Sequence, residues 1–425
     1  MQRYDSYKDS GIQWLGEIPS HWEMQRTKYI WRETDTRSEN GSEQLLSVSQ
    51  YDGVRESKSD SRSESLIGYK LVKQSELVIN IMLAWLGGLG VSKYEGLVSP
   101  AYCVYKLISK QNPYFLHYLY RTPMYLSEFA RRSSGIVPSR WRMYSDDFGE
   151  VLTLLPPLPE QQAIASYLDT ATAKIDEAIA QQQKMIDLLN ERKQIIINNA
   201  VTKGLNPNAK MKPSGIDWIG NIPEHWEVKK LKHVTSKIGS GSTPRGGAEV
   251  YQDSGVMFLR SQNIYNDGLR LDDVAHIVDG VHQKMKGTQV KCGDILYNIT
   301  GGSIGRCCCY NIENEANVNQ HVSIVRPLGI NAKYLMFNLQ SDNAQRQLRE
   351  TLKGGNREGL AAATFKEFLI LTCPQEEQIQ IVSHIEKMFV DIDLAISNAT
   401  KQITLLQERK QIIINDVVTG KVKVC

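Results

Sequence analysis

The stretch that decides the fold is NERKQIIINNAVTKG, residues 190–204, because it returns as QERKQIIINDVVTGK at residues 407–421. The match is longer than the quoted phrase. Aligning Glu160 with Glu377 keeps an ungapped register to the end of both segments, and about half of the aligned residues are identical. A charged and then triply apolar segment therefore occurs twice, far apart in one chain.

A second repeat lies upstream of each tail. The sequence SGIQWLGEIPSHWE from Ser10 returns as SGIDWIGNIPEHWE from Ser214. Each half of the chain thus has an opener, a long middle and a repeated tail. The long period excludes a solenoid of short units and indicates a tandem duplication with internal pseudo-symmetry.

The repeated tails have the periodicity of long helices, because apolar residues recur every seven positions with only Gln182 interrupting the row. The rows are Leu168, Ile175, Leu189 and Ile196, then Ile385, Ile392, Ala399, Leu406 and Ile413, with companions Ala171, Ala178, Met185, Met388 and Ala395. A rise of 1.5 Å per residue predicts rods of roughly 65 Å. Prolines precede both tails, and Gly204 and Gly420 follow them, as expected at helix ends.

The triple isoleucines exceed what a narrow helix seam needs. Three adjacent residues point in three directions around a helix, so this end of each tail should be covered on several sides. These residues are Ile195, Ile196, Ile197, Ile412, Ile413 and Ile414.

Composition sets limits on the function. A chain of 425 residues is long enough for two or more domains, and a net charge of +3 does not by itself identify a nucleic-acid binder. Seven cysteines have no framework spacing, and Cys307–Cys309 lack a second ligand pair for zinc, which favours thiols on a buried strand. We see no signal peptide and no run long enough to cross a membrane, so we expect a cytoplasmic protein without a membrane partner.

Both middles are predicted to be mixed α/β in the same order. Strand-like runs start at Glu76, Ala101, Gly293 and His321, and each pair brackets a glycine loop, LAWLGGLG from Leu83 or TGGSIGR from Thr300. Short helices follow from Asn112 and Asn331. The middles share this order with little identity, which predicts one scaffold carrying two different surfaces.

Catalytic motifs are weak. QNPYF around Asn112 lacks the second proline of the amino-methyltransferase motif, and Asn112 as a helix N-cap before Pro113 explains it. GSGSTPRGG from Gly239 lacks a phosphate-loop pattern and favours a flexible loop or a loop against a DNA backbone. His21 and His225 recur within the openers, which favours packing over catalysis. No metal site is expected.

Basic residues with nearby Ser, Asn and Gln are typical of phosphate positioning and base reading. For any single residue the alternative is an ordinary solvated charge. The candidates for DNA binding are Arg131, Arg132, Arg140, Arg142, Arg245, Arg260, Lys284, Lys286, Arg306 and Arg357.

The duplicated plan resembles the specificity subunit of Type I restriction-modification systems. The resemblance is carried by the second opener, GSGSTPRGG, GDILYNITGGSIGR and the tail from PPLPEQQAIASYLD to ERKQIIINNAVTKG. It implies an α+β fold in which two pseudo-symmetric target recognition domains of mixed α/β structure are separated by two long antiparallel coiled-coil helices. The implied segments are recognition domain 1 (1–155), a central helix (156–204), recognition domain 2 (205–372) and a C-terminal helix (373–425).

The resemblance also implies a function without a catalytic centre in this chain. Each recognition domain would read one half of a bipartite site in double-stranded DNA. The helices would set the spacer and dock two methylation subunits, which hold S-adenosylmethionine and methylate adenine N6. The candidates for docking these subunits are the two isoleucine triplets, Ile195, Ile196, Ile197, Ile412, Ile413 and Ile414. The alternative is that the repeat simply packs against itself, and both can be true. Restriction subunits can join through them to cut DNA. The chain itself would need no cofactor. The alternatives are a coiled-coil scaffold whose globular domains bind protein, and a fused DNA-modifying enzyme.

Overall fold

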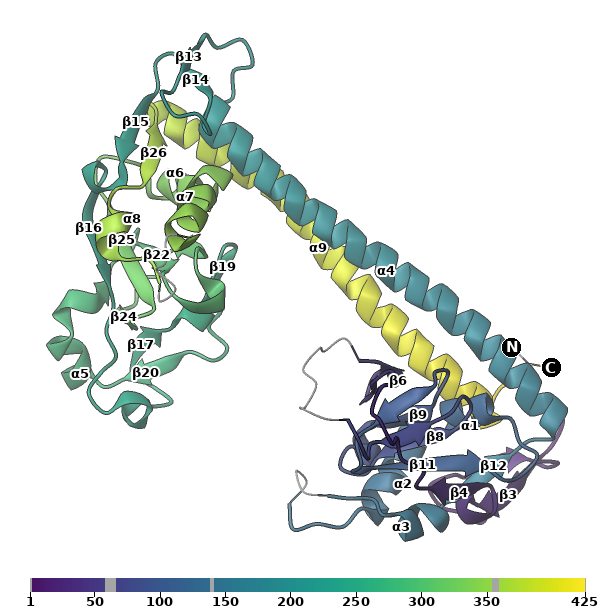
Figure 1. Cartoon of the computed structure of the whole chain (residues 1–425). Coiled ribbons are helices and arrows are strands. Elements are labelled where there is room, and N and C mark those ends of the chain that lie inside the picture. Colours follow the sequence, from purple (N-terminus) through teal and green to yellow (C-terminus); the bar gives the residue numbers. More distant parts are fainter. Residues whose placement is uncertain (1, 58–65, 138–140, 354–358, 425) are drawn as a thin grey trace. The chain divides into compact units, whose positions relative to one another are not determined.

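The computed structural model describes residues 2–57, 66–137, 141–353 and 359–424. It divides the chain into two compact units (Figure 1). The first unit joins residues 1–183 to residues 400–425, and the second unit contains residues 184–399. Each unit therefore combines one globular domain with part of each repeated tail, and the two globular domains keep the name recognition domain that the resemblance gave them.

Each repeated tail forms one continuous helix. The first tail forms α4 (Leu158–Lys203), and the second forms α9 (Gln375–Val418). Within each unit the two helices run side by side (Figure 1). In the first unit Lys410 Nζ lies 2.7 Å from Asp176, and in the second Lys193 Nζ lies 2.5 Å from Asp393. Lys193 and Asp176 of α4 occupy the same repeat positions as Lys410 and Asp393 of α9. The ion pairs are thus reciprocal, as antiparallel pairing of two equivalent helices requires.

The predicted heptad rows face inward. All of their members are buried or half-buried in the unit that contains them, beginning with Leu168 and Ile175 on α4 and Ile385 and Ile392 on α9. The companion row is correct except for Met185, whose side chain is exposed. An a/d-type stripe on each helix therefore supplies the contact between them.

The last turn of each long helix depends on a glycine. Gly420 has a positive φ of 76°, and an added Cβ there would collide with Pro19 of the first opener. Gly204 has a φ of 71°, and an added Cβ would lie 3.3 Å from Trp226 of the second opener. Left-handed backbone and close approach both favour glycine. Each opener therefore packs on the end of a long helix.

The first recognition domain is built on an antiparallel four-stranded sheet. In sheet order its strands are β4 (Trp31–Thr34), β11 (Tyr102–Leu107), β8 (Leu77–Asn80) and β9 (Leu89–Val91). Its helices are α1 (Pro113–Tyr120), α2 (Pro123–Arg132) and α3 (Ser145–Gly149). Two-stranded pairs complete it: β1 (Tyr7–Asp9) with β2 (Glu17–Pro19), β3 (Glu23–Arg26) with β12 (Leu152–Leu155), β5 (Leu46–Ser49) with β6 (Gly53–Glu56), and β7 (Lys70–Val72) with β10 (Gly96–Val98).

The second recognition domain repeats this sheet. Its strands, in the same order, are β16 (Thr235–Ser240), β25 (Val322–Pro327), β22 (Ile295–Asn298) and β23 (Cys307–Cys309). The helices are α6 (Ala332–Gln340), α7 (Asp342–Lys353) and α8 (Ala362–Phe365), and the matching pairs are β13 (Met211–Pro213) with β14 (Asn221–Pro223) and β15 (Glu227–Lys230) with β26 (Leu369–Thr372). The shared strand order confirms the predicted scaffold.

The second domain also carries a second sheet. Its strands, in order, are β20 (Ala275–Ile277), β17 (Val256–Leu259), β24 (Ala316–Val318) and β21 (Gln289–Val290), of which β17 and β24 are parallel. Helix α5 (Asp279–Lys284) and the hairpin of β18 (Ile264–Tyr265) and β19 (Gly268–Leu269) lie in the same insertion. The second middle, residues 228–372, is also longer than the first, residues 24–155, and it contains this insertion.

The fold class predicted from the sequence is confirmed. The chain has two mixed α/β domains and two long helices, α4 and α9, which pair antiparallel in each unit. The strand of three cysteines, β23, is buried as expected, and burial raises the pKa of the Cys308 and Cys309 thiols to about 12. These thiols are packing residues of the sheet rather than reactive groups.

Candidate DNA and partner interfaces

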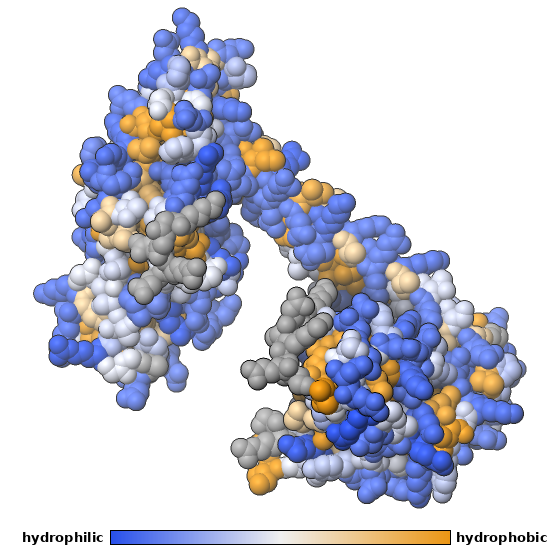
Figure 2. Space-filling view, viewed as in Figure 1, coloured by the Kyte–Doolittle hydropathy of each residue, from blue (hydrophilic) through white to orange (hydrophobic). Residues whose placement is uncertain are grey.

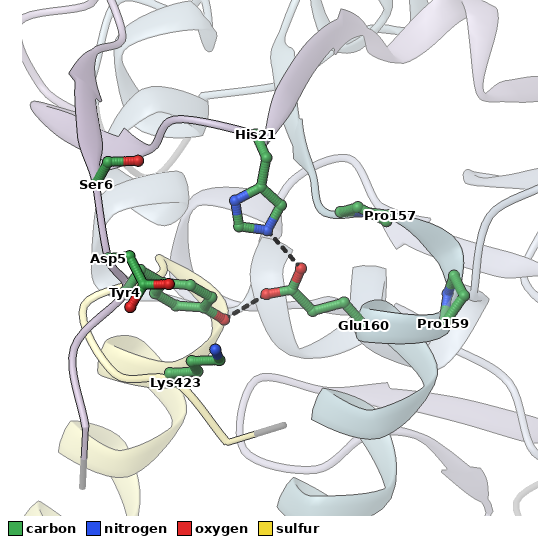
Figure 3. A pocket seen from close by; sticks show the side chains of 8 residues that line it. All are labelled: Tyr4, Asp5, Ser6, His21, Pro157, Pro159, Glu160 and Lys423. Atoms are coloured by element: carbon green, nitrogen blue, oxygen red, sulfur yellow. Dashed lines mark hydrogen bonds and ion pairs between the residues drawn. The ribbon is translucent and has the colours of Figure 1, made fainter.

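One glutamate at the start of α4 holds the first opener. His21 Nε2 lies 2.8 Å from one carboxylate oxygen of Glu160, and Trp22 Nε1 donates to the other at 3.1 Å. The Tyr4 hydroxyl donates to the same carboxylate (Figure 3). Tyr4, His21 and Glu160 border a cavity of about 450 Å³. Its other lining residues are Asp5, Ser6, Pro157, Pro159 and Lys423.

The second opener is held in the same way. His225 Nε2 lies 2.7 Å from Glu377, and Trp226 Nε1 donates to that carboxylate at 3.2 Å. Both tryptophans are fully buried. Hydrogen bonding and packing therefore account for the recurrence of the two histidines, as the sequence indicated.

The residue that follows this glutamate in each repeat is a glutamine, and its side chain forms a hydrogen bond with the recognition domain. Gln161 accepts a hydrogen bond from the backbone N–H of Asn112 at 2.8 Å, and Gln378 does the same for Asn331. The Asn112 side chain in turn accepts from the backbone N–H groups of Tyr114 and Phe115. The predicted N-cap role of Asn112 is confirmed, and its amide is committed to α1 rather than to a flipped base.

Two arginines of the first basic cluster hold a buried carboxylate. Arg131 donates to both Glu128 oxygens at 2.7 and 2.8 Å, and Arg132 donates at 2.6 Å. Burial alone would raise the pKa of Glu128, but the two guanidinium groups outweigh it and the pKa is lowered. Arg131 remains largely exposed while Arg132 is not. As DNA contacts both remain predictions, with a structural task that the sequence did not reveal.

The rest of that cluster lies in a hairpin loop. Arg142 is exposed, and its backbone pairs with Ser134 through two hydrogen bonds of 3.0 Å. The neighbouring Trp141 packs against Trp85. Arg140 lies outside the described residues. Of the three arginines that the structure describes, Arg142 is the one that forms no ion pair with a described carboxylate.

The basic candidates of the second domain are dispersed. Arg260 donates to the backbone carbonyl of Asp273 at 2.9 Å and lies over the Tyr251 ring. Arg306 stacks on Tyr265 with 4.8 Å from its guanidinium carbon to the ring centroid. The exposed candidates are Arg245, Lys284 and Lys286, while Arg357 lies outside the described residues. The described candidates belong to different elements, because Arg260 follows β17, Lys284 ends α5 and Arg306 precedes β23.

Within each isoleucine triplet the side chains differ in exposure, and equivalent members of the two triplets are the exposed ones. Ile197 is buried, and Ile196, Ile413 and Ile414 are half-buried against the cores. Ile195 and Ile412, which occupy equivalent repeat positions, are 51% and 59% exposed. One member of each triplet therefore points outward.

A second apolar residue extends each outward position, and the sequence analysis missed it. Leu188 precedes Ile195 by seven residues, Leu405 precedes Ile412 by seven, and both leucines are exposed. Seven residues are about two helical turns, so each pair shares one helix face. Figure 2 shows apolar patches recurring along the long helices. The signal that could have identified these leucines is their identity in both copies.

These two Leu–Ile pairs, Leu188 with Ile195 and Leu405 with Ile412, are here called the outer pairs. One outer pair belongs to the second unit and the other to the first. An exposed Glu-Arg dipeptide separates the members of each pair, at Glu191 and Glu408 with the following arginines. The described residues contain no group of three metal-ligating side chains that could hold an ion. No helix among them is long and apolar enough to span a membrane.

Comparison with known proteins gives these features a family context. Residues 223–405 match the family described as Type I restriction modification DNA specificity domain. The MjaVIII specificity subunit of a Type I restriction enzyme from Methanocaldococcus jannaschii is 28% identical over 283 residues, which cover 65% of this chain and 63% of that protein. The match therefore spans less than two thirds of that relative.

Two further comparisons cover more of the chain. The putative type I restriction enzyme MjaX specificity subunit of the same organism is 25% identical over 449 residues and is matched over 96% of both chains. A solved chain from work described as "Structural basis underlying complex assembly and conformational transition of the type I R-M system" has a TM-score of 0.66 at 14% identity, covering 95% of this chain and 99% of that chain. The similarity to this solved chain supports the fold described above.

The duplicated openers, the reciprocal helix pairing and the shared sheet order extend over nearly the whole chain, as do the matches to the MjaX subunit and to the solved chain. The relatives carry the name of the subunit for specificity, not of a catalytic subunit. Residues 223–405 thus match the DNA specificity domain of Type I restriction-modification systems, and the chain is similar to proteins that are named as specificity subunits of such systems.

Proposed function

We propose that this chain recognises a bipartite site in double-stranded DNA, with each recognition domain reading one half. The observation that carries the proposal is the equivalence of the two units. Both contain a four-stranded sheet of the same strand order, and the segments that connect its strands differ in sequence. A common scaffold with two surfaces suits the reading of two unrelated half-sites.

The helices are proposed to dock two methylation subunits, and through them restriction subunits. The outer pairs support this because they are equivalent in sequence position and exposed in both units. Two copies of one surface on a pseudo-symmetric chain fit two copies of one partner. Burying an exposed aliphatic side chain contributes about 1.5–3 kcal/mol, so each outer pair offers a useful share of an interface.

The chemistry is proposed to reside in the partners. The methylation subunits would bind S-adenosylmethionine and methylate adenine N6, and the restriction subunits would cut DNA. The role of this chain would be to hold DNA and partner in register. The commitment of Asn112 to a helix cap, rather than to a base, supports this division of tasks.

The test is a map of N6-methyladenine in a host that expresses this chain with its methylation subunit. The expected result is one motif with two specified halves, a methylated adenine in each and an unread spacer of constant length. A continuous motif would contradict the proposal. Omitting the methylation subunit is the control, and methylation by this chain alone would indicate a fused enzyme instead.

A protein-binding scaffold is the remaining alternative. Binding of the assembled complex to DNA should weaken steeply with salt, because contacts to phosphates release counterions. Sequence-specific binding that is absent at every salt concentration would favour the scaffold.

A further inference from the structure

In the first recognition domain, residues 134–137 and 141–143 form the described part of a hairpin, and its exposed residues Ile136 and Val137 are here called the tip. Ser134 and Arg142 exchange two backbone hydrogen bonds of 3.0 Å at the base of this hairpin. The next residue, Met143, is buried and donates its N–H to the carbonyl of Ile81 at 3.0 Å. The base of the hairpin is therefore attached to the loop that follows β8.

Two tryptophans join the hairpin to that loop. Trp141 of the hairpin and Trp85 of the loop have ring centroids 5.3 Å apart in an edge-to-face arrangement. Trp85 Nε1 donates to the Met82 carbonyl at 3.1 Å. These contacts hold the base of the hairpin in one conformation. The described residues beyond the base are therefore exposed to solvent and are not packed against the domain.

The residues presented are apolar. Ile136 is 96% exposed and Val137 is also exposed. On the loop after β8, the exposed residues are Met82, Leu83 and Leu86. An isolated exposed aliphatic residue is ordinary, but a group of them beside an anchored tryptophan pair marks an interaction surface.

The charge around this tip favours a polyanion. Residues 133–145 contain no carboxylate, and Arg142 is exposed directly beside Trp141. Apolar side chains flanked by arginine are the means by which proteins insert into base steps and kink the duplex. A protein partner present twice would instead need the tip twice, and the corresponding stretch GGNREG from Gly354 contains no large apolar residue.

Resting on the proposed function, we propose that Ile136 is a wedge. It inserts between two base pairs in the half-site read by the first recognition domain, while Arg142 contacts the adjacent phosphate or groove edge. The half-site read by the second domain receives no such insertion. Specificity in the first half-site then depends partly on how easily one base step unstacks.

The experiment uses the complex of full chain and methylation subunits on its methylated motif. 2-Aminopurine is placed in turn at each position of both half-sites except the methylated adenines, whose own extrusion would raise the signal. Wild-type complex should raise the fluorescence at one step of the first half-site only. Ile136→Ser should abolish that rise and weaken binding roughly tenfold, because the gain from burial is partly offset by the cost of unstacking.

A matched control is Leu328→Ser, which removes a residue 60% exposed in the second unit. It should leave both the fluorescence and the affinity at wild-type values. Because Ile136 is almost fully exposed, its replacement should not change the melting temperature. Trp141→Phe, which keeps a ring against Trp85, should retain the fluorescence signal.

Three outcomes would overturn the wedge. One is an unchanged fluorescence profile in Ile136→Ser, and another is a rise in neither half-site with wild-type complex that still binds its motif. A third is loss of a methylation subunit from Ile136→Ser without any effect on DNA, which would make the tip a protein contact. Absence of motif-specific binding by any variant would instead refute the proposed function.

Discussion

The arginines of the first recognition domain have two different roles, which their individual contacts distinguish. Glu128 is buried at the end of α2 and needs partners, and Arg131 and Arg132 supply them. Arg142 has no such duty visible in its hydrogen bonds and is exposed. Replacing all these arginines together would therefore mix a loss of stability with a loss of DNA contacts, so they must be tested separately.

Stability should depend on the Glu128 ion pairs. Arg131→Ala combined with Arg132→Ala leaves the carboxylate buried without its donors and should lower the free energy of unfolding by about 1–3 kcal/mol, after allowance for the exposure of Arg131. Urea denaturation measures this, with Arg142→Ala as the control that stays near wild type. An equal effect of Arg142→Ala would contradict it.

The same site predicts a pH dependence. The pKa of Glu128 is lowered in the folded chain, so its stabilisation is present above the unfolded value of about 4.3 and is lost as pH falls through the folded pKa. The difference in unfolding free energy between wild type and Glu128→Gln should shrink between about pH 5 and pH 3. A difference that does not change with pH over this range would exclude an ionised Glu128.

DNA binding should depend on Arg142. Arg142→Ala should weaken binding at every sequence if it contacts a phosphate, and should reduce the slope of log affinity against log salt by about 1. If it reads a base, discrimination at one position should fall by about 1–3 kcal/mol. The control is Lys28→Ala, because Lys28 already pairs with Glu150. An unchanged slope and unchanged discrimination would make Arg142 ordinary surface.

Each long helix has apolar residues on two faces, an inner face that packs against the other helix and an outer face that is exposed. The inner rows pair α4 with α9, and the reciprocal Lys–Asp pairs keep them antiparallel. The outer pairs are not used by either unit. An exposed apolar position that recurs in both copies is best explained by a partner that recurs as well.

Ile195→Asp together with Ile412→Asp should release the methylation subunits while the helices stay folded. A carboxylate at the centre of an apolar contact loses the burial energy and adds a desolvation penalty. Gel filtration measures the assembly, and circular dichroism confirms helicity. Ile379→Asp, another exposed residue of α9, is the matched control. A complex that survives the double change would place the docking surface elsewhere, for example in the recognition domains.

The helices should also act as a ruler. Inserting four residues between Ala180 and Lys184, and four at the equivalent place between Ser397 and Lys401, lengthens each rod by about 6 Å with a turn of about 40° beyond one full turn. Two base pairs advance about 7 Å and rotate about 70°. The unread spacer should therefore grow by one or two base pairs.

A library of sites with every spacer length, scored by methylation, measures the preference of the insertion variant. Both half-sites should remain unchanged. Replacing residues 181–183 with alanine, without any insertion, is the control for sequence alone. An active variant that keeps its original spacer would show that the helices do not set the distance.

The whole molecule is organised as two equivalent units, and this organisation predicts modular specificity. Exchanging residues 24–155 for the corresponding domain of a similar specificity subunit should change one half-site only. The exchanged segment ends before Glu160 and Gln161, so the attachments to α4 are retained. Methylation mapping reads the outcome. A change in both half-sites would mean that the two domains are not independent readers.

Local patterns were enough to predict the elements. The repeated tails, the heptad rows, the glycines that end both helices and the Asn112 cap could be predicted because each depends on residues close together in sequence. The order of elements along the chain was also accessible, since both middles repeat the same sequence of strand, glycine loop and helix, whereas the order of the strands within each sheet came only from the structure. The family resemblance rested on these same segments.

Tertiary structure alone decided which of these residues are available. Three consecutive isoleucines look alike in the sequence, and only the rotation of each helix against its neighbours makes Ile195 and Ile412 the outward ones. The task of Arg131 and Arg132 could not be read because burial of Glu128 depends on packing from distant segments. Local periodicity determines what an element is, whereas burial, a property of the whole unit, determines which side chains remain free to bind.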